Sequence, residues 1–183
     1  MKPEYESRIL EVDIKKAINK LKSLNAIYVD DYVYTRYVYD TKPAHKNKWI
    51  RLRSDGSKTT LTFKEFKSKT VDGTNELEIE VSDLEKTKEF LKILGYEPRS
   101  IQENKRTRYV LNDVEIDIDS WPYIPAFIEV EGKNETEVNK VIDALKECGK
   151  EVTNIDVQGI YEKYGYSKED TNYLSFKGDD INE

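Results

Sequence analysis

The sequence predicts an α+β fold: a closed eight-stranded antiparallel β-barrel with helices packed on its outside. Three observations lead to this prediction. Eight segments alternate between apolar and polar residues with a period of two, as half-buried strands do. Short runs of turn residues separate several neighbouring segments, which indicates antiparallel hairpins. Many segments carry charged side chains on one face and apolar side chains on the other, so the two faces need different surroundings.

The eight expected strands lie within the first 131 residues. They cover 4–10, 27–39, 49–53, 59–66, 76–81, 100–111, 114–119 and 127–131. Asp55-Gly56, Asp72-Gly73 and Asn112-Asp113 lie between consecutive strands and tolerate the positive φ of tight turns. Closing eight strands into a barrel removes exposed sheet edges and leaves a lumen suited to side chains and one small ligand.

Segments whose apolar residues follow helical spacing lie between the expected strands and after them. The apolar stripe of a first helix consists of Ile14, Ala17, Ile18, Leu21 and Leu24. A second helix is expected to begin with a capping box made by Ser82 and Glu85, and a third to start near residue 135. A short fourth helix is expected over 157–164. The last residues, 168–183, are polar and acidic and are expected to fray.

Length and composition narrow the class of protein. The 183 residues suit one domain, expected over 1–167, followed by a polar acidic tail over 168–183. A net charge of -6 argues against general nucleic-acid binding. No apolar stretch approaches the roughly 20 residues that cross a bilayer. The single cysteine, Cys148, cannot form an intramolecular disulfide and is expected to pack in the core. We therefore expect a cytoplasmic protein that binds neither nucleic acid nor membrane.

Charged residues lie two apart on several expected strands, and like signs occur in blocks. The acidic positions include Glu4, Glu6, Glu76, Glu78, Glu80, Asp117, Asp119, Glu129 and Glu131, and the basic ones Arg8, Arg51, Arg53, Arg106 and Arg108. A solvated face explains any single pair, but blocks of one sign repel unless a counter-ligand is present. Carboxylates suit Mg²⁺ or Mn²⁺, and guanidinium groups suit phosphate oxygens. One lumen carrying both would hold a metal-complexed polyphosphate.

The order of these motifs resembles the CYTH, or triphosphate tunnel, superfamily, which contains class IV adenylate cyclases, thiamine triphosphatases and inorganic tripolyphosphatases. The motifs that carry the resemblance are Glu4-Tyr5-Glu6-Ser7-Arg8, Arg51-Leu52-Arg53, Leu61-Thr62-Phe63-Lys64, Glu76-Leu77-Glu78-Ile79-Glu80, Asp117-Ile118-Asp119 and Phe127-Ile128-Glu129-Val130-Glu131. Two positions depart from the superfamily pattern. Arg8 stands where a lysine is usual, and Asn104 stands where a Lys-x-Arg motif usually begins.

The resemblance implies two-metal phosphoryl chemistry with Mg²⁺ or Mn²⁺. The implied metal ligands are Glu4, Glu6, Glu78, Asp117, Asp119, Glu129 and Glu131. The implied substrate-binding residues are Arg8, Arg51, Arg53, Lys64, Arg106 and Arg108, of which Arg8, Lys64 and Arg106 would also assist catalysis.

The first functional hypothesis is hydrolysis of a triphosphate (tripolyphosphate, ATP or thiamine triphosphate) by a monomer or homodimer. No adenine-reading motif is evident, which slightly favours a hydrolase. Conversion of ATP to cyclic AMP and pyrophosphate by a class IV-type cyclase is the alternative. A non-catalytic module that binds a nucleotide or polyphosphate is a second alternative.

Other candidate residues receive structural interpretations. His45, the only histidine, lies in a polar loop and is given no catalytic role. The tyrosines at 28, 32, 34, 37 and 39 are expected to pack on a strand, with one or two free to stack on a base at the tunnel mouth. The segment 121–125, with two prolines, is expected to be a rigid connection that plugs one end of the barrel.

Overall fold

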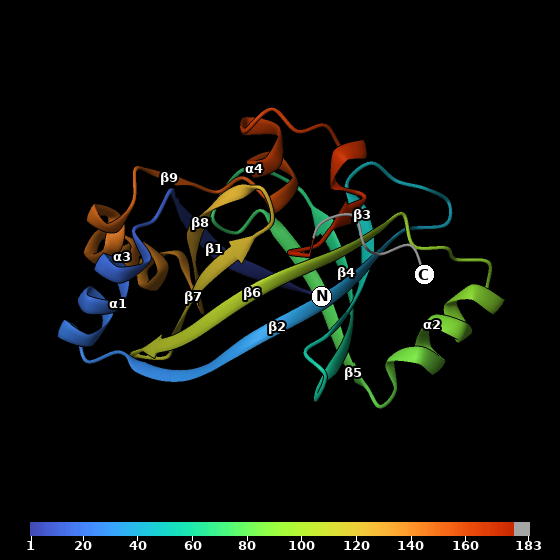
Figure 1. Ribbon diagram of the computed structural model, residues 1–183, viewed down its shortest axis with the longest axis horizontal. Coiled ribbons are helices and arrows are strands. Elements are labelled where there is room, and N and C mark those ends of the chain that lie inside the picture. Colours follow the sequence, from blue (N-terminus) through green and yellow to red (C-terminus); the bar gives the residue numbers. More distant parts are fainter. Residues whose placement is uncertain (178–183) are drawn as a thin grey trace.

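The computed structural model describes residues 1–177, and its central element is a closed β-barrel (Figure 1). Its strands are β1 (Lys2–Leu10), β2 (Ile27–Asp40), β3 (Lys48–Ser54), β4 (Thr59–Phe66), β5 (Thr74–Val81), β6 (Ser100–Leu111), β7 (Val114–Trp121) and β8 (Ile124–Gly132). They are hydrogen-bonded in the order β6-β2-β3-β4-β5-β1-β8-β7, and β7 also pairs with β6, which closes the ring. Every pairing within the ring is antiparallel. The predicted fold class is confirmed.

Two of the three predicted turn pairs act as the sequence predicts, whereas Asp72-Gly73 ends the longer connection over 67–73 and has no positive φ. Asn112 and Asp113 form the two-residue connection between β6 and β7 with φ values of 52° and 64°. Between β3 and β4, Gly56 has a φ of 91°, and Asp55 Oδ1 accepts hydrogen bonds from the backbone N–H groups of Ser57 and Lys58. Both connections fix the register of the strands they join, and this register decides which side chains enter the lumen.

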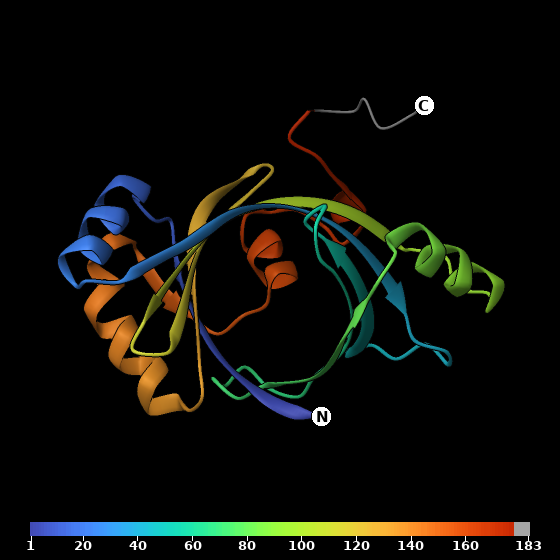
Figure 2. The same cartoon turned by 90° about the horizontal axis from the view of Figure 1, so that it is seen from below.

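Helices cover two opposite sides of the barrel (Figure 2). The helices α1 (Ile14–Ser23) and α3 (Glu135–Leu145) lie side by side over β1, β7 and β8. They bury an apolar cluster that includes Ile9, Ile116 and Ile128 from the strands and Leu21 and Leu145 from the helices. The 3₁₀ turn η1 (Lys146–Cys148) follows α3, and Cys148 is buried in the same cluster, as expected.

The helix α2 (Leu84–Ile93) covers the other side only in part. Leu91 packs against Tyr39 and Leu52, but Leu77 and Ile79 on the outer face of β5 stay more than half exposed. The helices therefore leave apolar side chains uncovered on the outer face of β5. The predicted capping box at Ser82 is wrong. Asp83 is the N-cap, because its carboxylate accepts the backbone N–H of Lys86.

The segment after α3 returns to the barrel. β9 (Glu151–Thr153) pairs with β1, and α4 (Val157–Lys163) lies over one end of the lumen in both views (Figures 1 and 2). The turn η2 (Glu169–Thr171) and the short strand β10 (Tyr173–Leu174) follow, and β10 pairs in parallel with β6. Leu174 is buried against α4. The expected fraying is therefore wrong for these residues, and 178–183 lie outside the described part of the chain.

None of the described helices has the length and apolar character needed to span a bilayer.

Candidate active site in the barrel lumen

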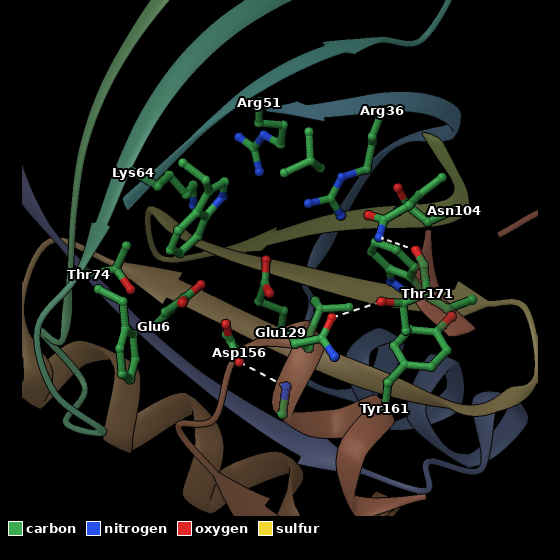
Figure 3. A pocket seen from close by; sticks show the side chains of 18 of the residues that line it. Glu6, Arg36, Arg51, Lys64, Thr74, Asn104, Glu129, Asp156, Tyr161 and Thr171 are labelled. Carbon is green, nitrogen blue, oxygen red and sulfur yellow. Dashed lines mark hydrogen bonds between the residues drawn. The ribbon is translucent and has the colours of Figure 1, made fainter. Parts of the chain in front are cut away.

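A cavity of about 770 Å³ occupies the lumen (Figure 3). Its wall is built by inward-facing side chains of the barrel strands, together with residues of α4 and the segments that flank it. The predicted site residues in this wall are Glu4, Glu6, Arg8, Arg51, Arg53, Lys64, Glu78, Arg106, Arg108, Asp119, Glu129 and Glu131. Asp117 is not among the lining residues. It is buried and forms ion pairs with Arg106 and Arg108.

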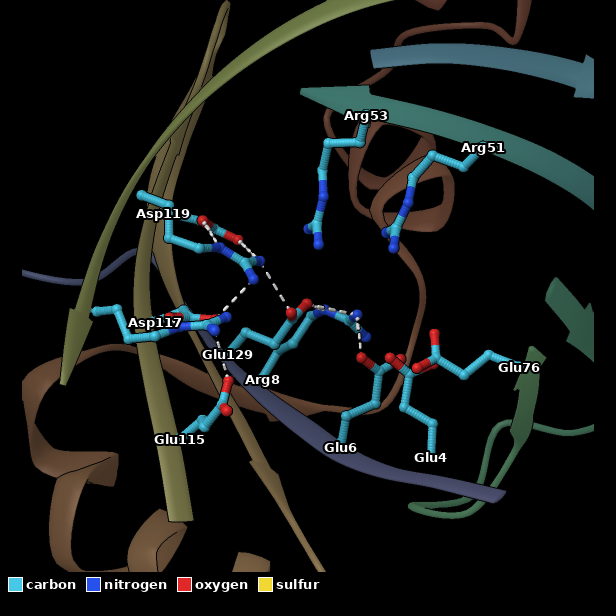
Figure 4. A network of polar contacts seen from close by, with 12 residues as sticks. Glu4, Glu6, Arg8, Arg51, Arg53, Glu76, Glu115, Asp117, Asp119 and Glu129 are labelled. Carbon is cyan, nitrogen blue, oxygen red and sulfur yellow. Dashed lines mark hydrogen bonds and ion pairs between the residues drawn. The ribbon is translucent and has the colours of Figure 1, made fainter. Parts of the chain in front are cut away.

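Two arginines hold most of the carboxylates on one side of the lumen (Figure 4). Arg106 Nη2 lies 2.7 Å from Asp119 Oδ2 and 2.9 Å from Glu129 Oε1, and its Nη1 lies 2.6 Å from Asp117 Oδ2. Arg8 donates to Glu129 through Nε at 2.9 Å and to Glu6 through Nη2 at 2.8 Å. Burial opposes ionisation of Glu129, but Arg8 and Arg106 outweigh it and hold its pKa well below the usual range.

A lysine neutralises the neighbouring acidic positions. Lys64 Nζ lies 2.8 Å from Glu4 Oε2 and 3.3 Å from Glu76 Oε2. The ammonium group comes from β4, whereas the two carboxylates come from β1 and β5. Lys64 therefore ties together strands on which the acidic blocks would otherwise repel one another.

Glu131 is the exception within this acidic region. It forms no ion pair with the side chains that the structure describes, those of residues 1 and 3–177, although it lines the cavity. Burial, with the nearby charges of Glu4 and Glu129, raises its pKa to about 8. The described residues contain no ready-made group of three acidic, histidine or cysteine ligands. An unpaired carboxylate beside others is nevertheless the donor chemistry that Mg²⁺ or Mn²⁺ requires, so this side of the lumen fits a divalent cation.

This raised pKa gives a stability prediction. The folded protein retains a proton on Glu131 up to about pH 8, whereas the unfolded chain loses it near 4.5. Stability therefore falls as the pH rises between these values. Glu131→Gln should raise the free energy of unfolding by on the order of 2 kcal/mol near pH 9, after allowance for solvent screening, and by almost nothing near pH 4. Urea denaturation at both pH values measures the difference.

Glu80→Gln is the matched control, because Glu80 lies on the same strand stripe as Glu76 and Glu78 but is exposed and pairs with Lys58 at 3.2 Å. It should change stability little at either pH. Mg²⁺ should raise the free energy of unfolding of the parent protein by more than it raises that of the Glu131→Gln variant. An equal gain for Glu131→Gln at both pH values would show that Glu131 is not held near other carboxylates.

The opposite side of the lumen is basic. Arg51 and Arg53 point from β3 towards the carboxylate network (Figure 4), and both rely on one acidic partner. Glu78 Oε2 lies 3.4 Å from Arg51 Nη2 and 4.0 Å from Arg53 Nη2. Burial and the charges of Arg51 and Arg106 lower the pKa of Arg53 to about 10. This side therefore carries excess positive charge that an anionic ligand would neutralise.

Comparison with known proteins identifies the family. The CYTH domain model matches residues 2–160, which is most of the chain. The chain belongs to the CYTH family. The family includes triphosphatases and proteins proposed to be adenylate cyclases, and its enzymes generally depend on divalent metals.

Solved structures share the fold of this CYTH protein. A conserved hypothetical protein of Pyrococcus furiosus superposes with a TM-score of 0.73 at 23% identity, over 86% of this chain and 99% of that chain. A proposed adenylate cyclase of Vibrio parahaemolyticus gives 0.63 at 16% identity, over 96% of each chain. A Hippeastrum protein gives 0.61 at 14%, over 93% of this chain and 100% of that chain. Curated protein sequences gave no match.

Sequence reasoning missed several residues in the cavity wall of this CYTH chain. Arg36 enters the lumen from β2, and Asp156, Gln158 and Tyr161 line it from the α4 region. Arg36 was detectable, because Tyr34, Arg36 and Val38 alternate on one face of β2, but the many tyrosines of this strand drew the interpretation towards packing and base stacking. The α4 residues carry no period-two signal, and only the fold brings them to the lumen.

The other residues considered in the sequence lie in exposed or packing positions. His45 is exposed. Tyr34 and Tyr39 are buried, and Tyr32 stacks on Tyr34 with ring centroids 5.5 Å apart, which fits packing on the strand. Trp121 is buried in the cluster that also contains Tyr161, whose hydroxyl donates to the Pro122 carbonyl at 2.8 Å. The β7–β8 connection is thus packed against α4 at one end of the barrel.

Proposed function

We propose that this CYTH protein hydrolyses a triphosphate, inorganic or organic, inside the barrel with Mg²⁺ or Mn²⁺. One observation carries the proposal: the lumen separates an acidic side, where Glu131 has no ion pair with the described side chains, from a basic side, where arginines exceed carboxylates. A metal-complexed triphosphate matches both sides at once, since the cation complements the carboxylates and the phosphate oxygens complement the arginines.

Glu131 and Glu4 are the ligands we assign first to the cation, with Glu6, Glu129 and Asp119 beside them. Bound metal would shield the phosphate charge and lower the pKa of an attacking water. Glu4 already holds Lys64, so cation binding would weaken that ion pair and free the ammonium group for the phosphate chain. Lys64 is therefore assigned to the boundary between the two sides.

Arg51 and Arg53 bind the phosphate oxygens in this proposal. Their guanidinium groups present several N–H donors in a plane, which matches the geometry of a phosphoryl group. They also stabilise the negative charge that develops on the phosphate oxygens during transfer. Glu78, which contacts both, orients them when no ligand is present.

Arg8 and Arg106 receive a positioning role in place of the phosphate contacts that the family resemblance implied. The Arg8 nitrogens contact Glu129, Glu6 and the carbonyl of Ile155, the last at 2.9 Å. The Arg106 nitrogens contact carboxylates in the same way. Both guanidinium groups therefore fix the carboxylates that face the cation. Arg108, held by Asp117 and Glu115, supports the same network from its edge.

A phosphorus NMR time course tests the proposal. Tripolyphosphate, thiamine triphosphate and ATP are each incubated with the protein and Mg²⁺ or Mn²⁺. We expect release of orthophosphate from at least one of them, complete loss of turnover in EDTA, and recovery when metal is restored in excess. The Hippeastrum protein with the same fold has a dominant triphosphatase activity, which supports this expectation.

The same experiment separates the alternatives. Cyclic AMP and pyrophosphate formed from ATP would contradict the hydrolase and establish a cyclase. Absence of turnover with every substrate, together with thermal stabilisation by tripolyphosphate, would instead establish a binding module.

A further inference from the structure

Arg36 is a lumen arginine that the acidic network leaves without a partner. It lies on β2, where it is paired with Arg53 of β3 on one side and Gln102 of β6 on the other. Its side chain extends into the cavity near Arg51 (Figure 3). Unlike Arg8 and Arg106, it forms no ion pair within residues 1–177, and its Nε is buried with no hydrogen-bond partner.

The surroundings of Arg36 are unfavourable for a cation. Burial and the charges of Arg51 and Arg53 hold its pKa well below the usual range for arginine. Arg36 is half-buried as a residue, but its Nε is shielded from solvent. A shielded charge without a counter-charge costs free energy unless the fold or a ligand compensates for it.

An aromatic contact holds the guanidinium in place. Its central carbon lies 4.6 Å from the centroid of the Trp121 ring. Trp121 is buried and packs edge-on against Tyr161 of α4, with ring centroids 6.3 Å apart. A cation–π contact orients the planar group but neutralises none of its charge. The fold thus presents an oriented and uncompensated cation to the lumen, which is the arrangement of an anion-binding site.

Asn104 lies next to this site. It pairs with Tyr34 on β2, so it is the diagonal neighbour of Arg36, and it is buried with its Oδ1 unpartnered. The adjacent Lys105 does not supply a charge to the lumen, because its ammonium lies over the Phe176 ring, 4.5 Å from the centroid. Position 104 is thus neutral where β6 continues with Arg106 and Arg108 on the same face.

We propose that Arg36 binds a phosphoryl group of the substrate together with Arg51 and Arg53, and that it supplies from β2 the cation that Asn104 does not supply from β6. The inference rests on the proposed triphosphate ligand and adds a phosphate-binding residue to it. The substrate class is an extended polyphosphate chain, because the three arginines lie on two adjacent strands facing one lumen.

Calorimetric titration with tripolyphosphate and Mg²⁺ tests the inference. Arg36→Gln should weaken binding by about tenfold or more, and Arg36→Lys by less, because it keeps the charge without the planar donors. Arg36→Gln combined with Asn104→Lys should recover at least about half of the lost affinity on a logarithmic scale, because the cation is returned to the neighbouring strand. In turnover assays the Michaelis constant should rise much more than kcat falls.

Lys105→Gln is the matched control, because its charge lies outside the lumen, and it should leave binding unchanged. The melting temperature gives an independent readout: Arg36→Gln should not lower it, whereas a purely structural arginine would. Binding by Arg36→Gln within about twofold of the parent protein, or no recovery with Asn104→Lys, would overturn the inference.

The titration also separates this inference from the proposed hydrolase. Binding without turnover, weakened by Arg36→Gln, would leave the inference standing while the hydrolase proposal fails. If the parent protein does not bind tripolyphosphate at all, the inference fails, whereas turnover of thiamine triphosphate or ATP still decides the hydrolase proposal.

Discussion

Replacing Arg106 by methionine should lower the free energy of unfolding by about 3–5 kcal/mol near neutral pH. Arg106 contacts Asp117, Asp119 and Glu129, and all four side chains are buried. Without the guanidinium, three carboxylates would remain close together in a region of low dielectric constant. The loss should shrink as the pH falls towards about 4, because protonation would then relieve their repulsion. Urea denaturation across this pH range measures it.

Arg36→Met is the control for this prediction. Both arginines line the same lumen, but Arg36 has no ion pair in the described part of the chain. Its replacement should change stability by less than about 1 kcal/mol, the loss of the Trp121 contact being offset by relief of charge repulsion. Similar losses for the two variants would mean that packing, rather than the carboxylate network, determines the role of Arg106.

Replacing Arg53 by alanine should raise the Michaelis constant for a triphosphate by about 30- to 100-fold, with a smaller effect on kcat. Its guanidinium is 4.0 Å from the nearest carboxylate oxygen, on Glu78, and 4.6 Å from the centroid of the Tyr34 ring. The folded protein therefore gives this cation only a weak ion pair and an aromatic contact. A phosphate would complete its interactions. For the same reason the variant should not melt at a markedly lower temperature.

Two further variants sharpen this test. Arg53→Lys should have an intermediate Michaelis constant, since a compact ammonium replaces a planar group that can donate two hydrogen bonds to one phosphate. Lys58→Ala removes an exposed cation that pairs with Glu80 and should leave kinetics unchanged. If Arg53→Ala changed neither the Michaelis constant nor kcat, phosphate binding on this side of the lumen would be contradicted.

The barrel could be predicted because short stretches of sequence encode its strands and hairpins. Period-two alternation placed the strands, and Asn112-Asp113 and Asp55-Gly56 fixed hairpins whose register carries the charged residues inward. Helix capping was less predictable. Ser82 and Asp83 are both good N-caps, and only the backbone geometry at Asp83 decides between them. The exposure of Leu77 and Ile79 depends on where α2 packs, and the alternation of residues along a strand cannot predict this position.

The ionic site was predictable in composition but not in pairing. Alternation brings Arg8, Arg51 and Arg106 to one lumen, but it cannot tell which carboxylate each will meet across the barrel. The structure pairs Arg8 and Arg106 with acidic residues and leaves Arg36 without an ion pair in the part of the chain it describes, because side-chain length and strand register determine these contacts. A residue's charge therefore predicts its presence in the site, whereas its role depends on long-range geometry.

The most direct test of the central claim is a crystal structure with Mn²⁺ and a non-hydrolysable triphosphate analogue, using anomalous scattering to locate the metal. We expect manganese at Glu131 and Glu4, with phosphate oxygens against Arg51, Arg53 and Arg36. Phosphates bound to Arg8 and Arg106 with the carboxylate network broken, or an analogue bound outside the lumen, would contradict it.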